Sequence, residues 1–336
     1  MKRRPFLLGT AAVCLPGCGV GAPRRPPPVE VRAPTTPTVE PAVEPVSGAI
    51  MRAFRATRDA HEDALGAAIE GAGGLGFIRE GETVFVKVNT NSGHTFPYSS
   101  SPTAVAWLAR QIQSRGGRAV FGDRSFWGDA HTSRNFDTNG IRLAVESSNA
   151  ELLVLDDDVA WVELDPATAP NWVPPVRVPR VALEAAHVVN LACAKTHFIA
   201  GATLALKNLI GFVHAVDRMR EGNLKTHDRA RLPHQIADIH RAVRPRLHVV
   251  DGFRALVTGG PTPMSGDGPT IVDAKTVIAS TDPIACDVAG ILLLQEHAPE
   301  SEAIARVDAW EHPTVRGAID GNIGDARRGS TEIARV

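Results

Sequence analysis

The sequence predicts an α/β fold, with a mostly parallel or mixed sheet and helices on both faces. Three observations support this prediction. Short runs of β-branched and apolar residues recur along the chain, and several are apolar at nearly every position, as in strands buried on both faces. Stretches with helical periodicity alternate with these runs, which is the pattern of strands joined by crossover helices. Glycine or proline stands where several of these helices would begin or end.

The elements follow in order from residue 51. Residues 51–69 have helical periodicity and run into the glycine cluster 71–76, so we expect a helix that ends there. TVFVKVN (83–89) is β-rich and is the first expected strand. Further strands are expected at 118–123, 151–155, 187–195, 246–252 and 276–280, and further helices at 102–114, 141–148, 203–220, from about 233, and at 283–294.

Composition excludes some classes of protein. The chain has 336 residues, of which 43% are hydrophobic and 22% are charged, so it can bury a sizeable core. Its formal net charge is −1 and its aromatic content is 5%. A nucleic-acid-binding protein would show a basic excess, and base stacking needs aromatic side chains. We therefore expect no nucleic-acid partner.

The first 22 residues predict export. Arg3 and Arg4 precede a short apolar run, 6–15, which resembles a twin-arginine signal peptide and is too short to span a bilayer. LPGC (15–18) resembles a lipoprotein processing box, with proline an unusual member. Cleavage before Cys18 would remove three cations, take the net charge from −1 to −4, and leave Cys18 for lipidation. Cleavage after Ala22 is the alternative, although proline follows it. We expect a membrane-anchored lipoprotein on the periplasmic side.

The rest of the chain divides into a spacer and one domain. Residues 23–47 are proline-rich and poor in large apolar groups, as in an extended linker, and residues 48–336 are expected to form the α/β domain. Cys193 and Cys286 are the cysteines of that domain, and whether they pair stays open. Because the chain has no CxxC pair, we expect no iron–sulfur cluster of its own.

Polar residues recur where the expected strands end. In a parallel sheet, ligands bind outside the carboxyl ends of the strands. The residues concerned are Lys87, Asn89, Asp123, Lys195, His197, Asp251 and Asp282. Each also has a structural interpretation: Asp282 precedes a proline, as helix N-caps do, and Asp123 or Asp251 could cap a turn. Their recurrence favours a binding site.

The stretch KTHFIAGATLALKNLIGFVH (195–214) is mostly apolar but carries cations and an amide. On a helix over 203–220, one side would present Lys207, Asn208, Gly211, His214 and Arg218. A glycine within a helix is destabilising, so Gly211 predicts the close approach of a backbone or a ligand. The alternative is a solvated helix face, but such a face would more often include glutamates.

The segment 217–240 is polar and basic and contains three histidines. It is expected to be a loop followed by a helix, and it suits either a cover over an anionic ligand or an ordinary exposed loop. Seven of the twelve histidines lie between residues 187 and 248, so a divalent metal stays open, although no HExxH spacing occurs. A P-loop, a dinucleotide-binding fingerprint and a GxSxG elbow are absent from the sequence.

These segments together resemble the family catalogued as "domain of unknown function 362". The matching pieces, in order, are VKVN (86–89), FGD (121–123), KTH (195–197), TLALKNLIG (203–211), HQIADI (234–239), VVDG (249–252), GGP (259–261) and ASTDPIACD (279–287). The resemblance implies an α/β fold with a shared polar site. Its matching polar positions are Lys87, Asn89, Asp123, Lys195, His197, Lys207, Asn208, His234, Asp251, Asp282 and Asp287. Some members carry a ferredoxin-like segment, which suggests redox work, but this chain lacks those cysteines.

The expected function is binding of a small anionic or metal-bound ligand. Lys87, Lys195 and Lys207 would neutralise its oxygens, Asn89 and Asn208 would orient it, and His197 would transfer protons. Asp251, Asp282 and Asp287 would hold a divalent cation or the lysines. The catalytic candidates are His197, Lys195 and Lys207, and Gly211, His214 and His234 are further binding candidates. An enzyme linked to redox or cofactor chemistry, with a redox partner protein, stands beside two alternatives: a periplasmic binding protein and a metal-handling lipoprotein.

Overall fold

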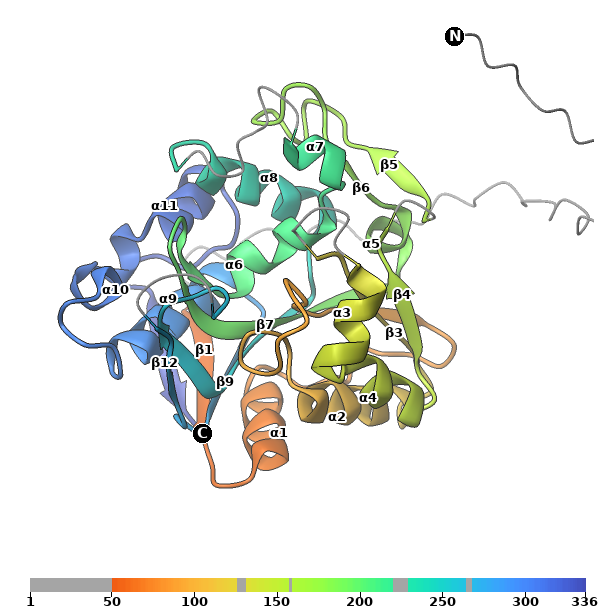
Figure 1. The fold of residues 1–336 in the computed structure, drawn as a ribbon, viewed down its shortest axis with the longest axis horizontal. Helices are drawn as coiled ribbons and strands as arrows, with labels where there is room; N and C mark the ends of the chain where they lie inside the picture. The colour runs from red at the N-terminus through yellow and green to blue at the C-terminus, as the bar shows by residue number, and fades with distance from the viewer. Residues whose placement is uncertain (1–49, 126–130, 157–158, 220–228, 264–267) are drawn as a thin grey trace, which may run out of the picture. The chain divides into compact units, whose positions relative to one another are not determined.

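A ten-stranded mixed sheet forms the centre of the fold (Figure 1). The computed structural model describes residues 50–125, 131–156, 159–219, 229–263 and 268–336. The predicted signal peptide (1–22), the linker (23–47) and Cys18 lie outside these residues. The strands of the sheet are β1 (Met51–Thr57), β2 (Thr83–Lys87), β3 (Arg118–Asp123), β4 (Glu151–Val154), β7 (His187–His197), β8 (Gly201–Thr203), β9 (Leu247–Thr258), β10 (Thr270–Val272), β11 (Thr276–Ser280) and β12 (Thr331–Arg335).

Strand direction divides the sheet. The order is β12-β1-β11-β9-β7-β2-β3-β4, with β8 paired to β7 and β10 paired to β9. The five strands from β9 to β4 are parallel to one another. β11 runs antiparallel to both its neighbours, β9 and β1. The carboxyl end of β11 therefore lies at the opposite edge of the sheet from the carboxyl ends of the parallel strands.

The helices cover both faces of the sheet, as predicted. They are α1 (His61–Gly71), α2 (Pro102–Gln113), α3 (Thr132–Asn139), α4 (Ile141–Ser147), α5 (Arg180–Glu184), α6 (Ala205–Asn208), the 3₁₀ turn η1 (Leu209–Phe212), α7 (Ala215–Met219), α8 (Leu232–Val243), α9 (Pro283–Gln295), α10 (Ala303–Arg306), the 3₁₀ turn η3 (Ala309–Glu311) and α11 (Pro313–Asp320). β5 (Trp161–Glu163) and β6 (Arg177–Pro179) form a separate antiparallel pair.

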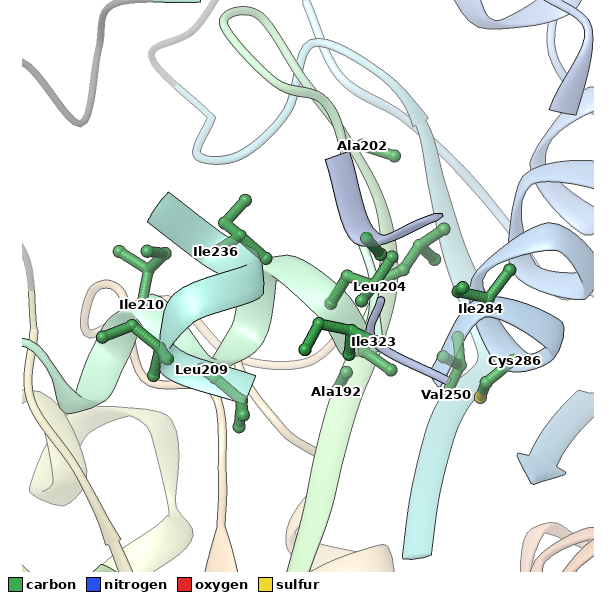
Figure 2. Close-up of a cluster of buried hydrophobic side chains, with 14 of the residues drawn as sticks. Ala192, Ala202, Leu204, Leu209, Ile210, Ile236, Val250, Ile284, Cys286 and Ile323 are labelled. Atoms are coloured by element: carbon green, nitrogen blue, oxygen red, sulfur yellow. The ribbon is translucent and has the colours of Figure 1, made fainter. Parts of the chain in front are cut away.

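Alternation along the strands builds two apolar layers. Val84 and Val86 of β2 pack with α1, α2 and α4, whereas Phe85 between them belongs to the layer under α6, α8, α9 and α11. Figure 2 shows part of this second layer, where Leu209 and Ile210 of η1 and Ile284 of α9 lie over the sheet. Lys87 follows in the same alternation as Phe85, so β2 directs it towards α6 and η1. Lys87 therefore lies on the same side of β2 as the core residue Phe85, and it lines the site described below.

Two expected helices are wrong. Residues 51–57 form β1, because this segment pairs with both β11 and β12, and the helix begins only at His61. Residues 203–220 do not form one helix. β8 turns back on β7 as far as Thr203, and Val213 is extended (φ −76°, ψ 129°) between η1 and α7. Tertiary pairing overrides helical periodicity in both places.

Candidate functional site

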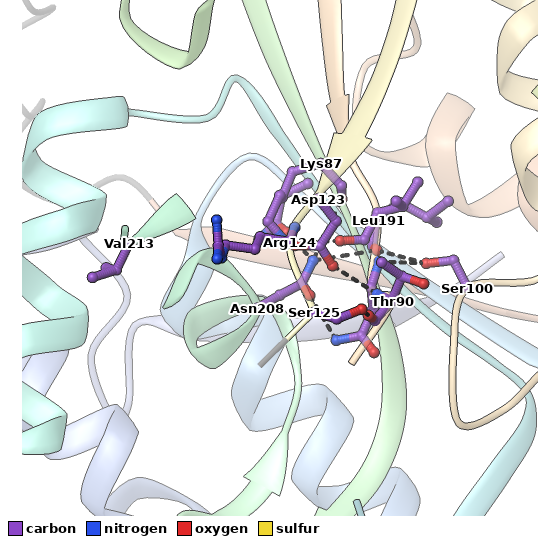
Figure 3. A network of polar contacts seen from close by, with 12 residues as sticks. Lys87, Thr90, Ser100, Asp123, Arg124, Ser125, Leu191, Asn208 and Val213 are labelled. Carbon is purple, nitrogen blue, oxygen red and sulfur yellow. Dashed lines mark hydrogen bonds and ion pairs between the residues drawn. The ribbon is translucent and has the colours of Figure 1, made fainter. Parts of the chain in front are cut away.

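A small cleft of about 70 Å³ lies where β2, β3 and β7 end and where α6 and η1 face them. Figure 3 shows the polar network beside it, in which Lys87, Asp123 and Asn208 lie close together. Eight of the thirteen sequence-predicted ligand-site residues line it, namely Lys87, Asn89, Asp123, Lys195, His197, Lys207, Asn208 and Gly211. Arg124, Thr203 and Arg218 line it as well. The cleft therefore gathers polar groups that are far apart in the sequence.

An ion pair forms the floor of the cleft. Lys87 Nζ lies 2.7 Å from Asp123 Oδ1, and both side chains are almost completely buried. Lys87 also donates to the carbonyl of Val88 (2.7 Å), and Asp123 accepts from the backbone N–H groups of Thr90 (2.6 Å) and Arg124 (2.7 Å). Burial lowers the pKa of Lys87, and the Asp123 carboxylate opposes that shift. These hydrogen bonds hold the pair in one geometry, as a buried pair requires.

Gly211 has no side chain because the ion pair occupies that space. A Cβ at this position would overlap Asp123 Oδ1 and Lys87 Nζ, and it would lie 2.6 Å from Lys87 Cε. The sequence predicted the close approach of a backbone or a ligand here, and the structure places the two side chains of the pair there instead.

A chain of amide groups crosses the cleft from β7 to α6. Lys195 Nζ donates to Asn89 Oδ1 (2.7 Å) and to the carbonyl of Tyr98. Asn89 Nδ2 then donates to Asn208 Oδ1 (2.8 Å), and Asn208 Nδ2 donates to Asn190 Oδ1 (2.8 Å). Burial lowers the pKa of Lys195 to about 8. Lys195 is thus tied into the scaffold and orients the asparagines.

Lys207 is placed differently from the other two lysines. It is partly exposed, and it makes no hydrogen bond or ion pair with the described part of the chain. Burial and, to a smaller extent, the positive charges of Lys195, Arg218 and Lys87 together lower its pKa to about 7. The Lys207 ammonium therefore releases its proton much closer to neutral pH than an ordinary lysine does.

Buried polar groups fix the short helix α6 that carries Lys207. Asp287 accepts the N–H of Leu206 (3.0 Å), and His240 Nε2 lies 2.9 Å from the carbonyl of the same residue. Asn190 Nδ2 donates to the carbonyl of Ala205 (2.8 Å). Burial lowers the pKa of His240 to about 4, so its imidazole is neutral and donates from Nε2. Four residues of helix are thus anchored from α9, α8 and β7.

Positive charge exceeds negative charge around the cleft. Arg218 is buried and donates from Nε to the carbonyl of Val213 (3.0 Å), and burial lowers its pKa to about 10. Arg124 donates to the carbonyl of Leu155 (3.2 Å). The cations that line the cleft are Lys87, Lys195, Lys207, Arg124 and Arg218, and Asp123 is the one acidic side chain among its described lining residues. Such a lining attracts anions.

His197 has a defined tautomer. Its Nδ1 accepts the backbone N–H groups of Ile199 (3.1 Å) and Ala200 (3.3 Å). A neutral His197 therefore carries its proton on Nε2 and is a hydrogen-bond donor there. Taking up a second proton at Nδ1 would break the turn between β7 and β8. The predicted role in proton transfer is less suited to this geometry than a fixed donor.

Thr203 was missed by the sequence analysis. Its hydroxyl is buried, lines the cleft, and has no hydrogen-bond partner among the described residues. Asn190 was missed too, although a polar residue inside the apolar run HVVNLACAK was an available sign. Arg124 gave no pattern to detect, because it is one basic residue among many.

Five predicted site residues lie outside the cleft. Asp282 is the N-cap of α9 and accepts the backbone N–H groups of Ile284 (2.8 Å) and Ala285 (2.9 Å). This is the helix N-cap that the sequence offered as the structural interpretation of Asp282. It follows β11, and because β11 is antiparallel, its end lies away from the cleft. Asp251 lies inside β9, which continues to Thr258, and pairs with His61 (3.0 Å). Asp287 serves α6 instead of the cleft.

The two remaining histidines also point elsewhere. His214 Nδ1 lies 3.0 Å from Arg177 Nη2 on β6, because the chain is extended at Val213 and does not continue the predicted helix face. His234 lies in a separate depression beside Asn171. The expectation that all thirteen residues form one site is therefore wrong for these five residues.

Among the residues that the structure describes, no group of three or more His, Cys, Asp or Glu side chains is placed to hold a metal ion. Cys193 and Cys286 are both buried and unpaired by any disulfide. No helix in the described ranges is long and apolar enough to cross a membrane.

Comparison with known proteins gives a family and distant relatives. The family described as "Domain of unknown function (DUF362)" matches residues 84–291. The "Thylakoid-associated protein sll1697" of Synechocystis sp. is 28% identical over 206 residues, which cover 59% of this chain and 60% of that protein. The lactate racemase apoprotein from Thermoanaerobacterium thermosaccharolyticum has a TM-score of 0.43 and 15% identity over 72% of this chain and 56% of its own. A Thermotoga maritima protein has a TM-score of 0.35 and 12% identity, covering 57% and 50%.

Proposed function

Because the chain belongs to the family described as domain of unknown function (DUF362), whose description assigns no activity, we propose a function from the cleft itself: it binds a small anion through a carboxylate or phosphate group. The observation that carries this proposal is Lys207, a cation at the mouth of a cationic cleft with no partner among the described residues.

Electrostatics supports an anionic occupant. The cations of the cleft repel one another, and this repulsion contributes to the low pKa of Lys207. A bound anion would reverse that effect and hold Lys207 in its charged form, with charge-assisted hydrogen bonds to the ligand oxygens. The buried hydroxyl of Thr203, which has no hydrogen-bond partner among the described residues, would supply a neutral hydrogen bond. Asn89 and Asn208 would orient the ligand through the amide chain.

The pKa of Lys207 also favours a second candidate, an enzyme. A neutral lysine amine near pH 7 can accept a proton from a bound substrate, and general bases work best with a pKa near the working pH. Lys195 is less suited to that role because its ammonium is already hydrogen-bonded. Turnover separates the candidates, since an enzyme alters its bound compound and a binding protein returns it intact. Electron transfer through an iron–sulfur cluster would need a partner protein, because the chain has no four-cysteine cluster motif.

Titration calorimetry with acetate and with inorganic phosphate tests the binding proposal. Lys207→Met should keep the melting temperature and lose at least about tenfold in affinity, which corresponds to one lost charge-assisted hydrogen bond. Lys275→Met is the matched control, because Lys275 lies on the surface and pairs with Asp59 (2.7 Å). Affinity that is equal in all three proteins would overturn the proposal. Unfolding of the Lys207 variant would show that this residue is structural.

The native occupant can be identified directly. The protein is purified from its own host, and its native mass is compared with its denatured mass together with its elemental content. A bound organic anion supports the cationic cleft. A bound metal ion would instead favour the metal-handling alternative.

We also propose that the protein is exported and held at a membrane by a lipid on Cys18. The thylakoid association in the name of the cyanobacterial relative concerns that protein. For this chain the support is the twin-arginine motif and the LPGC box, both outside the described residues. If Cys18 is lipidated, the mature protein should have the mass of a chain that begins at Cys18 plus the mass of the attached acyl groups. Cys18→Ser should release the protein from membranes. A mature chain that begins at Pro23 would contradict lipidation.

A further inference from the structure

A second and larger cavity lies directly beside the cleft. Its volume is about 530 Å³, against about 70 Å³ for the cleft, and the two share His197, Phe198 and Leu232. The turn from β7 to β8, the start of α8 and the segment from Glu302 to Thr314 enclose it. The cleft can hold a compact charged group, and anything larger attached to that group would have to extend into the second cavity.

The second cavity is lined mainly by apolar groups. Ile199, Ala200, Pro233, Ile304 and Val307 form much of its wall. An apolar cavity of this size is typical of sites for small organic molecules, which use a few polar groups for orientation. The cleft is therefore cationic, whereas the second cavity is suited to the hydrocarbon part of a ligand.

Phe198 stands at the junction of the two spaces. Its side chain is 54% exposed, although large aromatic groups are usually buried, and it lines both the cleft and the cavity. Its ring stacks on His197, with centroids 5.2 Å apart and planes 13° apart. Arg229 donates to its backbone carbonyl (2.9 Å), which helps to hold the segment in place. A fixed, exposed aromatic ring at this point offers a contact surface for an apolar ligand.

His312 adds a polar group to the cavity wall. Its Nδ1 lies 2.8 Å from Thr314 Oγ1, and its Nε2 is buried without a hydrogen-bond partner among the described residues. Burial lowers its pKa to about 4, so the ring is neutral. A buried polar atom without a partner is costly, and a polar atom of a ligand could satisfy it after a small shift.

We propose that the ligand is an amphipathic anion, with its charged group in the cleft and an apolar body in the second cavity against Phe198. This inference rests on the proposed anion-binding function and adds the chemical class of the ligand. The lysines hold the head, and burial of the body supplies most of the affinity. Simple anions such as acetate are then weak ligands of this site.

A series of straight-chain carboxylates tests this inference, with acetate, butyrate, hexanoate and octanoate titrated into the full processed protein. Each methylene that enters an apolar cavity should tighten binding about threefold to fourfold. Octanoate should therefore bind at least about 30-fold more tightly than acetate. Burial of three of its methylenes is enough to give that ratio of affinities.

Variants of α10 locate the effect. Ala303 is exposed and lines the cavity, so Ala303→Trp should reduce the ratio of octanoate to acetate affinity to near one. Ala305→Trp, on the same short helix but outside the lining, is the matched control and should keep the ratio. Val307→Phe fills the cavity from another position if the first variant folds poorly, and melting temperatures verify folding.

The outcomes separate the two proposals. If acetate binds in a manner that depends on Lys207 but longer chains bind no more tightly, the amphipathic ligand is wrong and the anion site stands. If no carboxylate and no alkyl phosphate of the same lengths binds, both are wrong. A chain-length effect that survives Ala303→Trp and Val307→Phe would place the apolar body elsewhere and overturn this inference.

Discussion

The protonation state of Lys207 couples ligand binding to pH. Its pKa is about 7, and a bound anion would raise that pKa. Below pH 7 the lysine is already charged, so affinity is highest and changes little. Above pH 7 binding must first protonate the amine, and affinity falls with rising pH until the pKa of the complex is reached.

We expect the Kd for sulfate, which does not titrate in this range, to rise by up to about tenfold per pH unit above pH 7. Calorimetry between pH 6 and pH 9 measures the effect, and buffers of different ionisation enthalpy should reveal proton uptake. In Lys207→Met the dependence of the sulfate Kd on pH above pH 7 should become weaker. The part that remains should be the contribution of Lys195, whose pKa is about 8. The same steep slope in both proteins would assign the titration to another group.

Gly211→Ala should destabilise the fold. Its Cβ would overlap the buried Lys87–Asp123 pair, and that pair cannot move without exposing or separating two charges. Overpacking and disruption of a buried ion pair predict a loss of about 2 kcal/mol or more in the free energy of unfolding, measured by urea denaturation. Gly66→Ala is the control. Gly66 lies within α1, and the nearest atom to its added Cβ would belong to Trp107 of α2, at 3.7 Å. This substitution should be neutral or stabilising. An unchanged stability for Gly211→Ala would mean that the pair is loosely held.

At the scale of elements, α6 shows how a very short helix can be positioned. Four residues make too few helical hydrogen bonds to stabilise themselves. Asp287, His240 and Asn190 bind its backbone from three other elements, and all three are buried. The predicted ligand role of Asp287 is thus replaced by support for the segment that carries Lys207 and Asn208.

Asp287→Asn tests this support through pH. Burial raises the pKa of Asp287 from 3.8 to about 8, while the N–H groups of Leu206 and Ala205 oppose that shift. Because the folded-state pKa is raised, the carboxyl contributes most stability below pH 4, and that contribution is lost as pH rises towards 8. Asparagine can still accept the N–H of Leu206 and never ionises.

The stability of Asp287→Asn relative to the original protein should therefore increase between pH 4 and pH 8, by about 1 kcal/mol or more. Urea denaturation of both proteins at pH 5 and pH 8 gives this difference, in which the titration of all other groups cancels. A difference that stays constant with pH would mean that Asp287 is ionised in the folded protein throughout.

At the scale of the whole molecule, strand direction decides which predicted residues meet. Parallel strands β2, β3 and β7 bring their carboxyl ends to one edge, and the cleft forms there. β11 is antiparallel, so Asp282 lies at the opposite edge. There it joins α9 to the C-terminal segment, since its Oδ2 accepts the N–H groups of Asp325 (2.5 Å) and Ala326 (3.0 Å).

Asp282→Ala should therefore lower stability without changing anion affinity. Loss of an N-cap alone costs about 1 kcal/mol, and two further hydrogen bonds are lost with it, so we expect about 2 kcal/mol or more. Asp308→Ala is the comparison, because Asp308 caps the short turn η3 through one N–H and otherwise makes only an exposed ion pair with Arg328 (2.7 Å), so its loss should cost less. Melting temperature and the Kd for acetate are measured on both. A weakened Kd in folded Asp282→Ala would return this aspartate to the ligand site.

The sequence by itself determined the α/β class, most of the strands and the family. It also determined most of the polar residues that line the cleft, because lysines and asparagines in otherwise apolar runs have few structural uses. Lys207, Asn208, Gly211 and Arg218 were grouped correctly, although the long helix used to group them does not exist. A 3₁₀ turn and a break at Val213 bring the same residues together by another path.

Only the tertiary structure decided the rest. Whether β11 runs parallel or antiparallel depends on long-range pairing, and local periodicity carries no information about it. For the same reason, local periodicity predicts a helix where β1 forms, and the sequence predicts a ligand role for Asp251, Asp282 and Asp287, which lie outside the cleft. The low pKa of Lys207 and the cavity beside the cleft arise from packing between distant segments, so they become visible only once the chain is folded.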